Sequence, residues 1–125
     1  MSPTRASPSL DFQACHCGGG TLDKLIQPAI LVILAAGPLH GYRLAERIGE
    51  MPMFGGQQPD ASGIYRFLRL MERKRLVAAA WNLSERGPAK RSYRITAAGR
   101  RCLVRWIETL EEYRRGVGQL LRAAR

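Results

Sequence analysis

The sequence has no long apolar run, few cysteines and few acidic residues, and each shortage excludes a class of protein. Its longest apolar run, residues 28–39, is far shorter than the roughly 20 residues that a membrane-spanning helix needs. Residues 1–10 contain Ser and Pro but no apolar segment of a secretory signal. Three cysteines, an odd number, do not build a disulfide framework. We therefore expect a cytoplasmic protein with no membrane partner.

Side chains suited to catalysis are also scarce. The two histidines are His16, in an N-terminal segment, and His40, in a Gly-Pro-Leu-His-Gly turn, where we expect it to pack locally or cap a helix. No two carboxylates share a face at the spacing of a general acid and base, and no glycine-rich phosphate loop follows a strand. These absences argue against an enzyme. An RNA-binding sheet would need more exposed aromatic residues than this sequence offers.

Positive charge, in contrast, is plentiful and confined to one part of the chain. The formal net charge is +10. Residues 1–59 contain four basic and four acidic residues, whereas residues 60–125 contain sixteen basic and six acidic ones. Charge concentrated in this way favours a polyanionic partner such as nucleic acid. The alternative is a basic surface that is merely solvated.

The spacing of apolar residues predicts three helices in the first 75 residues. Residues 28–36 are apolar almost all round, which predicts a central helix that starts at Pro28. A second helix is predicted over residues 42–49, and a Pro- and Gly-containing loop follows it. Asp60 is a suitable N-cap for a third helix that runs to about Lys74.

The third predicted helix has two opposite faces. At about 100° per residue, its apolar and basic residues point in different directions. Such a helix can pack on a core with one face and enter the major groove of DNA with the other, where a guanidinium can bind a guanine edge or a phosphate. The apolar set is Ile64, Leu68 and Met71, and the basic set is Arg66, Arg69 and Arg73.

A hairpin and a long helix complete the chain. Residues 76–83 and 91–96 have the alternation of strands, and the loop between them contains Gly87-Pro88. Thr96 is placed to cap the last helix. This order predicts a mainly α fold with a two-stranded wing (α+β), a winged helix-turn-helix followed by a C-terminal dimerisation helix.

Three segments follow from this interpretation. Residues 1–20 are an N-terminal tail, residues 21–96 form the DNA-binding domain, and residues 97–125 form the dimerisation helix. That helix has apolar residues at the 3.5-residue spacing that calls for a partner helix, although the same stripe could pack on its own domain. Gly116 and Gly118 each weaken a helix by ~1 kcal/mol relative to Ala, so we expect fraying beyond Tyr113. The predicted seam consists of Leu103, Trp106, Ile107, Leu110, Tyr113, Val117 and Leu120.

The tail carries one unexplained motif, Cys15-His16-Cys17. Its thiols and imidazole could bind a soft metal ion, and the thiols could instead form an easily reduced disulfide. Incidental cysteines in a tail are the third possibility. The motif lacks the second ligand pair that a typical zinc site has.

Four motifs together resemble the PadR family of bacterial transcriptional regulators. They are residues 37–42 (Gly-Pro-Leu-His-Gly-Tyr), Ile64-Tyr65 with the apolar residues that follow, Leu76-Val77 with Trp81, and residues 87–99 of the wing and final-helix entry. The resemblance implies a homodimer, most often a repressor, that binds a double-stranded DNA operator and can be released by a small ligand. A metal- or redox-responsive repressor that senses through the tail is the alternative.

The resemblance and the basic faces together give a set of expected contacts. Two positions depart from the family pattern: Arg75 stands where Gly is frequent, and residues 61–63 (Ala-Ser-Gly) replace Pro-Gly-Thr. The expected dimer interface and ligand pocket use the seam, from Leu103 and Trp106 to Val117. The expected DNA contacts are Tyr42, Ser62, Tyr65, Arg66, Arg69, Arg73, Arg86, Lys90 and Arg91.

Overall fold

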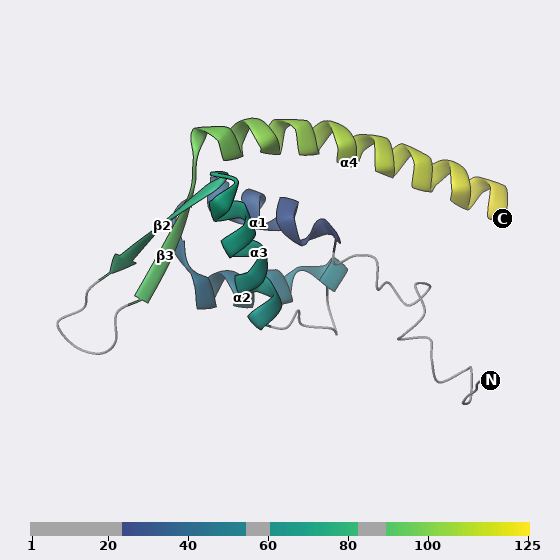
Figure 1. Ribbon diagram of the computed structural model, residues 1–125. Helices are drawn as coiled ribbons and strands as arrows, with labels where there is room; N and C mark the ends of the chain where they lie inside the picture. Colours follow the sequence, from purple (N-terminus) through teal and green to yellow (C-terminus); the bar gives the residue numbers. More distant parts are fainter. Residues whose placement is uncertain (1–23, 55–60, 83–89) are drawn as a thin grey trace, which may run out of the picture.

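The computed structural model describes residues 24–54, 61–82 and 90–125. Helices make up most of this part of the chain, and α4 extends from the body of the domain as a long arm (Figure 1). None of the described helices is long and apolar enough to cross a membrane. The elements in chain order are α1 (Ile26–Ala35), β1 (Leu39–His40), α2 (Gly41–Glu50), the 3₁₀ turn η4 (Pro52–Phe54), α3 (Ala61–Arg73), β2 (Val77–Asn82), β3 (Lys90–Ile95) and α4 (Ala97–Ala124).

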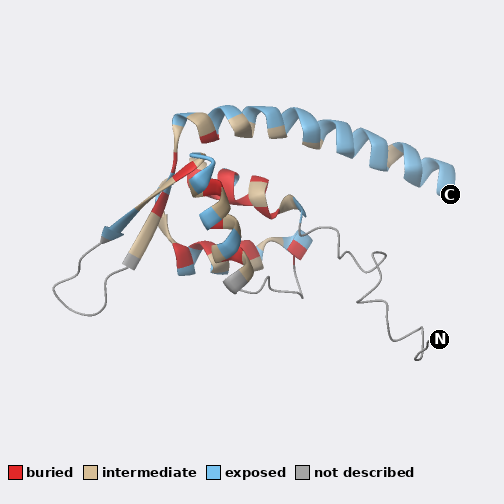
Figure 2. Ribbon diagram, in the orientation of Figure 1, coloured by how far each residue is buried: buried red, intermediate tan, exposed pale blue. Residues whose placement is uncertain are grey.

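The first three helices begin and end close to the predicted residues. Helix α1 starts at Ile26 rather than Pro28, and the proline is accommodated because the first turn of a helix needs no intrahelical N–H donors. The predicted N-cap Asp60 lies outside the described residues. Buried side chains of α1, α2 and α3 form one core with residues of β2 and β3 (Figure 2).

The predicted two-stranded wing is present as β2 and β3, and in the described part of the chain a strand that was not predicted, β1, joins them in a three-stranded sheet. Strand β1 pairs antiparallel with β3 through Leu39↔Tyr93 and His40↔Ser92, which gives the order β1-β3-β2. Strand β1 is only two residues long and follows a Gly-Pro turn, so it has no alternation that a sequence pattern could reveal. β2 and β3 pair from Val77↔Ile95 to Asn82↔Lys90, and Tyr93 and Ile95 on one side of β3 are buried.

The turn between α3 and β2 explains the departure at Arg75. Arg75 has φ 62°, in the left-handed region that favours glycine. The N–H of Leu76 donates to the carbonyl of Met71, and the N–H of Arg75 donates to the carbonyl of Glu72, both at 2.9 Å. These two hydrogen bonds define a Schellman motif, which normally ends a helix at a glycine. The position therefore has the conformation that the family pattern implies, although an arginine occupies it.

Thr96 joins the end of α3 to the start of α4. Its hydroxyl accepts a hydrogen bond from the N–H of Gly99 at 3.0 Å, which confirms the predicted N-cap. The same hydroxyl donates to the carbonyl of Arg75 at 2.6 Å. Gly99 is buried against the carbonyl of Leu76, where a Cβ atom would clash. The origin and direction of α4 are thus fixed by the turn that ends α3.

Helix α4 continues to Ala124 without a break, so the prediction of fraying beyond Tyr113 was wrong for this structure. The first turns of α4 pack on the core through Cys102, Leu103 and Trp106. Beyond them the helix is almost entirely exposed (Figure 2).

Candidate nucleic-acid interface

Helix α3 has the two faces that its spacing predicted. Ile64, Leu68 and Met71 are fully buried in the core. The residues of the predicted basic face, Arg66, Arg69 and Arg73, are exposed. Because the two sets lie on opposite sides of one helix, packing of the apolar side holds the three guanidinium groups toward solvent.

The start of α2 lies against α3 at a close contact. A Cβ atom on Gly41 would stand 2.6 Å from Cε1 of Tyr65, so the absence of a side chain at residue 41 lets the phenol ring fit beside the α2 backbone. Tyr65, a predicted DNA contact, is half-buried and packs on the edge of the core. Tyr42 is 47% exposed, and its ring lies 5.9 Å from that of His40, which confirms local packing of the histidine.

A surface cavity of about 370 Å³ lies between α2, α3 and the strands of the wing. Two guanidinium groups and four aromatic rings line it. Its mixture of positive charge and hydroxyl groups suits a polyanion better than an apolar ligand. The lining residues are Gly41, Tyr42, Tyr65, Arg69, Trp81, Arg91 and Tyr93.

Arg91, a predicted DNA contact, is held within the protein. One of its terminal nitrogens, Nη2, donates to both carboxylate oxygens of Glu72 at 2.8 Å. Its guanidinium also lies over the rings of Trp81 (5.8 Å) and Tyr93 (5.5 Å). The role of Arg91 in DNA binding stays a prediction, but its Nη2 group is already directed at the carboxylate of Glu72 on α3.

Tyr93 lies beneath this group and is 2% exposed. Burial raises the pKa of its phenol above the ordinary value of 10.0, whereas the positive charge of Arg91 lowers that pKa. The net direction is upward, so Tyr93 is a neutral phenol under physiological conditions.

Several predicted site residues cannot be placed. Arg86 and the motif Cys15-His16-Cys17 lie outside the described residues, and so do the side chains of Ser62 and Lys90. Among the residues that the structure does describe, no three His, Cys, Asp or Glu side chains are grouped as a metal site. Metal binding or redox chemistry in the tail stays a prediction.

Sequence reasoning missed two members of this surface, Glu72 and Trp81. Glu72 was not recognised because its partner Arg91 is 19 residues away, beyond the turn and the hairpin. Trp81 was predicted to share one face of the strand with Val77 and Ala79, yet it is 63% exposed and lies opposite Arg91 in the ladder. The hairpin register would have placed Trp81 opposite Arg91, but the sequence does not state that register.

The predicted dimer and ligand residues lie along α4. Leu103, Trp106 and Leu110 are half-buried at the end of α4 that packs on the core. The more distal seam residues and Ile107 are more than half exposed: Ile107 53%, Tyr113 57%, Val117 55% and Leu120 69%. The alternative, in which the whole stripe packs on its own domain, therefore holds only for the first turns.

These features define the class of protein. A helix-turn-helix followed by a β-hairpin, with a basic outer face on the second helix of the pair, is a winged helix-turn-helix. The chain belongs to the PadR-like family of transcriptional regulators, whose family model matches residues 30–105. This is a family of regulators and not of enzymes.

Comparisons with individual proteins agree with the family. The chain is 41% identical over 98 residues to the probable transcriptional regulator Rv1176c of Mycobacterium tuberculosis, a match that covers 74% of this chain. It spans about half (49%) of the length of that relative. The crystal structure of TA0346 from Thermoplasma acidophilum has a TM-score of 0.70 at 32% identity and covers 81% of this chain and 94% of its own.

A second similar structure was solved with DNA. Bacillus subtilis PadR in complex with operator DNA has a TM-score of 0.59 and 23% identity, over 66% of this chain and 46% of its own. At that identity the likeness establishes the shared fold.

Proposed function

We propose that this chain is a sequence-specific DNA-binding regulator, a homodimeric repressor that a small ligand releases from its operator. The observation that carries the proposal is the outer face of α3. Arg66, Arg69 and Arg73 are exposed there because the opposite face is fully buried. The protein of Bacillus subtilis with the same fold was crystallised on its operator DNA, which supports this assignment.

DNA binding is tested by selecting duplexes from a randomised pool and measuring their affinity by fluorescence anisotropy. If each subunit neutralises about four phosphates, the log–log dependence of affinity on salt has a slope of roughly −7 for a dimer. A slope near zero on every duplex would overturn DNA binding.

The contacts of single arginines can be separated in the same assay. Arg66→Ala should weaken binding to the selected duplex by ~1–3 kcal/mol if Arg66 binds a base edge. An equal loss on a random duplex would instead assign Arg66 to a phosphate.

Dimer formation through α4 is supported by its exposed apolar residues. Val117 and Leu120 continue the heptad spacing of Leu103 and Leu110 on a helix that leaves the domain. Two copies would bring two recognition helices to two half-sites of one operator. Sedimentation equilibrium that gave a monomer at micromolar concentration would remove this part of the proposal.

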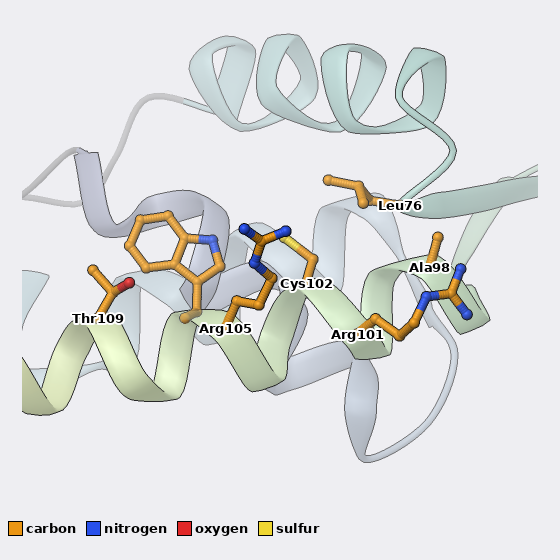
Figure 3. Close-up of a pocket in the computed structure, with 7 residues that line it drawn as sticks. Leu76, Ala98, Arg101, Cys102, Arg105 and Thr109 are labelled. Atoms are coloured by element: carbon orange, nitrogen blue, oxygen red, sulfur yellow. The ribbon is translucent and has the colours of Figure 1, made fainter.

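The ligand is proposed to bind beside α4. A cavity of about 430 Å³ lies along its first turns and is lined by Cys102, Trp106, Arg101 and Arg105. Figure 3 shows the side chains of Cys102, Arg101 and Arg105 projecting from this part of α4. Leu76, from the turn after α3, also lines the cavity. This lining favours an effector with an apolar body and a negative group.

An aromatic sulfonate, 8-anilinonaphthalene-1-sulfonate, is a suitable probe for this cavity. In a Trp81→Phe background, binding should quench the fluorescence of Trp106, and Arg101→Gln with Arg105→Gln should weaken that quenching. Quenching that is unaffected by the two substitutions would assign the probe to another surface.

A further inference from the structure

The ion pair between Glu72 and Arg91 joins the two parts of the surface that would face DNA. Glu72 lies in the last turn of α3, on the helix that carries Arg66, Arg69 and Arg73. Arg91 is the second residue of β3, at the side of the hairpin loop. Both side chains are about one-third exposed, and the Nη2 of Arg91 contacts both carboxylate oxygens at 2.8 Å. The pair therefore connects the recognition helix to the wing near the loop end of its strands.

The rings around Arg91 restrict its position further. Trp81, its partner across the ladder, and Tyr93, two residues along the same strand, both lie within 6 Å of the guanidinium carbon. The Nε atom of Arg91 is buried and has no hydrogen-bond partner in the described parts of the chain. A guanidinium held in this way, by one carboxylate and two ring faces, is poorly placed to leave for a phosphate.

We propose that Glu72 and Arg91 are positioning residues that set the distance between α3 and the wing, and that they act without contacting DNA. The inference rests on the proposed DNA-binding function. A recognition helix and a wing that contact adjacent grooves must match the separation of those grooves on the duplex. Arg69 of α3 and Arg91 of the wing line the same cavity, so a shift of the wing would also change the surroundings of Arg69.

The proposal predicts the sign of a charge effect. Glu72 is an acidic residue on a surface that would bind a polyanion. If electrostatic repulsion were its main effect, its neutralisation would tighten DNA binding. If Glu72 positions the wing, neutralisation loosens the wing and weakens binding despite the more favourable charge.

The experiment compares two variants that remove the same charge. Glu72→Gln keeps the shape of the side chain, and Glu50→Gln, at the exposed end of α2, is the matched control. Anisotropy is measured with a duplex that the wild-type protein selected from a randomised pool and with a random duplex of equal length. Glu72→Gln should bind the selected duplex roughly threefold to tenfold more weakly, since the ion pair is lost and one neutral oxygen acceptor replaces two charged ones. Glu50→Gln should bind as well as the wild type or slightly better.

Arg91 provides a second measurement. Arg91→Gln should leave the salt slope on the selected duplex unchanged. The double variant, Glu72→Gln with Arg91→Gln, should bind no more weakly than Arg91→Gln alone, because the two substitutions remove the same interaction. A phosphate contact by Arg91 would instead reduce the magnitude of the slope by about one per subunit. Arg91→Lys, which keeps the charge but loses the planar fork, should weaken binding under the proposal.

Thermal unfolding by circular dichroism identifies variants that are folded at the assay temperature. If Glu72→Gln is unfolded there, Arg91→Lys carries the test. Equal or tighter binding by folded Glu72→Gln, or a reduced salt slope for Arg91→Gln, would overturn the positioning role. Failure of the wild type to bind any duplex would overturn the proposed function itself, so the two failures are distinguishable.

Discussion

Helices α3 and α4 each combine a stripe of large apolar residues with several arginines. The two apolar stripes, however, have different surroundings. In α3 the stripe is completely buried: Ile64, Leu68 and Met71 have no exposed surface. In α4 the stripe becomes more exposed along the helix, and Leu120 reaches 69%. The same apolar pattern therefore belongs to the core where other elements of the domain cover it, and it is a candidate interface where they do not.

The difference also separates two tasks. Helix α3 is fixed on its own domain, so its arginine face is presented in a defined orientation. In the described part of the chain, helix α4 is held in its first turns, by Thr96 and Gly99 and by the side chains that pack on the core from Cys102 to Trp106. Its outer part would acquire a partner through dimerisation, and the direction of α4 from the domain would then set the spacing of two recognition helices. Mutations in the two helices should differ accordingly.

The largest effect is expected from a cavity in the α3 core. Leu68→Ala should lower the free energy of unfolding by ~2–5 kcal/mol, because Leu68 is fully buried and its neighbours cannot fill the space. The measurement is urea unfolding followed by circular dichroism. Val104→Ala, on the exposed side of α4 at 58% exposure, is the control and should stay within ~0.5 kcal/mol of the wild type. Equal losses in both variants would break the comparison.

Next in size is a charge in the outer seam of α4. Val117→Glu should weaken the dimer by on the order of 3 kcal/mol, since two-fold symmetry brings the two new carboxylates together. Analytical ultracentrifugation over a range of concentrations would measure the dissociation constant. Val104→Glu, outside the heptad seam, should leave the dimer intact. A Val117→Glu protein that dimerised like the wild type would place the interface elsewhere.

A pair of glycine substitutions in α4 should change stability in opposite directions. Gly99→Ala should destabilise the fold by ~1–3 kcal/mol, because the new methyl group would meet the Leu76 carbonyl and lie 2.8 Å from Cγ1 of Ile95. At Gly116 a Cβ would have no described atom within 4 Å, so Gly116→Ala should stabilise the helix by ~1 kcal/mol. Melting temperatures would show both effects. A gain at both sites would mean that α4 is not held at its start.

The smallest effect concerns pH. The pKa of Tyr93 is raised in the folded state, so its contribution to stability is complete below pH 10, the ordinary value, and is lost as pH rises through the folded value. Unfolding measured between pH 8 and about pH 11 should therefore show stability decreasing above pH 10. Tyr93→Phe should show a smaller decrease, and the same decrease in both proteins would remove Tyr93 as its cause.

Much of the fold followed from local patterns. The two faces of α3 are set by a spacing within 10 residues, and Thr96 was recognised as a cap because the residues after it read as a helix. Arg75 stands where glycine is frequent in the family, and its φ of 62° lies in the left-handed region that favours glycine. Each of these features depends on neighbours close in sequence, whose geometry the backbone itself dictates.

The candidate site was less accessible, because its decisive contacts join distant residues. Arg91 was assigned to DNA from its place beside a Gly-Pro turn, yet the packed structure pairs it with Glu72. Trp81 was assigned to one side of a strand, but how much of it the core covers depends on the length of the hairpin and the position of α3. Strand β1 was missed because two residues pair only when β3 is already beside them.

The sequence by itself determined the class of fold, the basic face of α3 and the apolar seam of α4, since periodicity places side chains on a helix without reference to the rest of the chain. Only the tertiary structure decided which charges are available and which apolar face lacks a partner. Ion pairs such as that of Glu72 with Arg91 form where chain segments meet, and burial depends on what reaches a surface. For this protein that difference separates Arg66, Arg69 and Arg73, which face solvent, from Arg91, which is paired with Glu72.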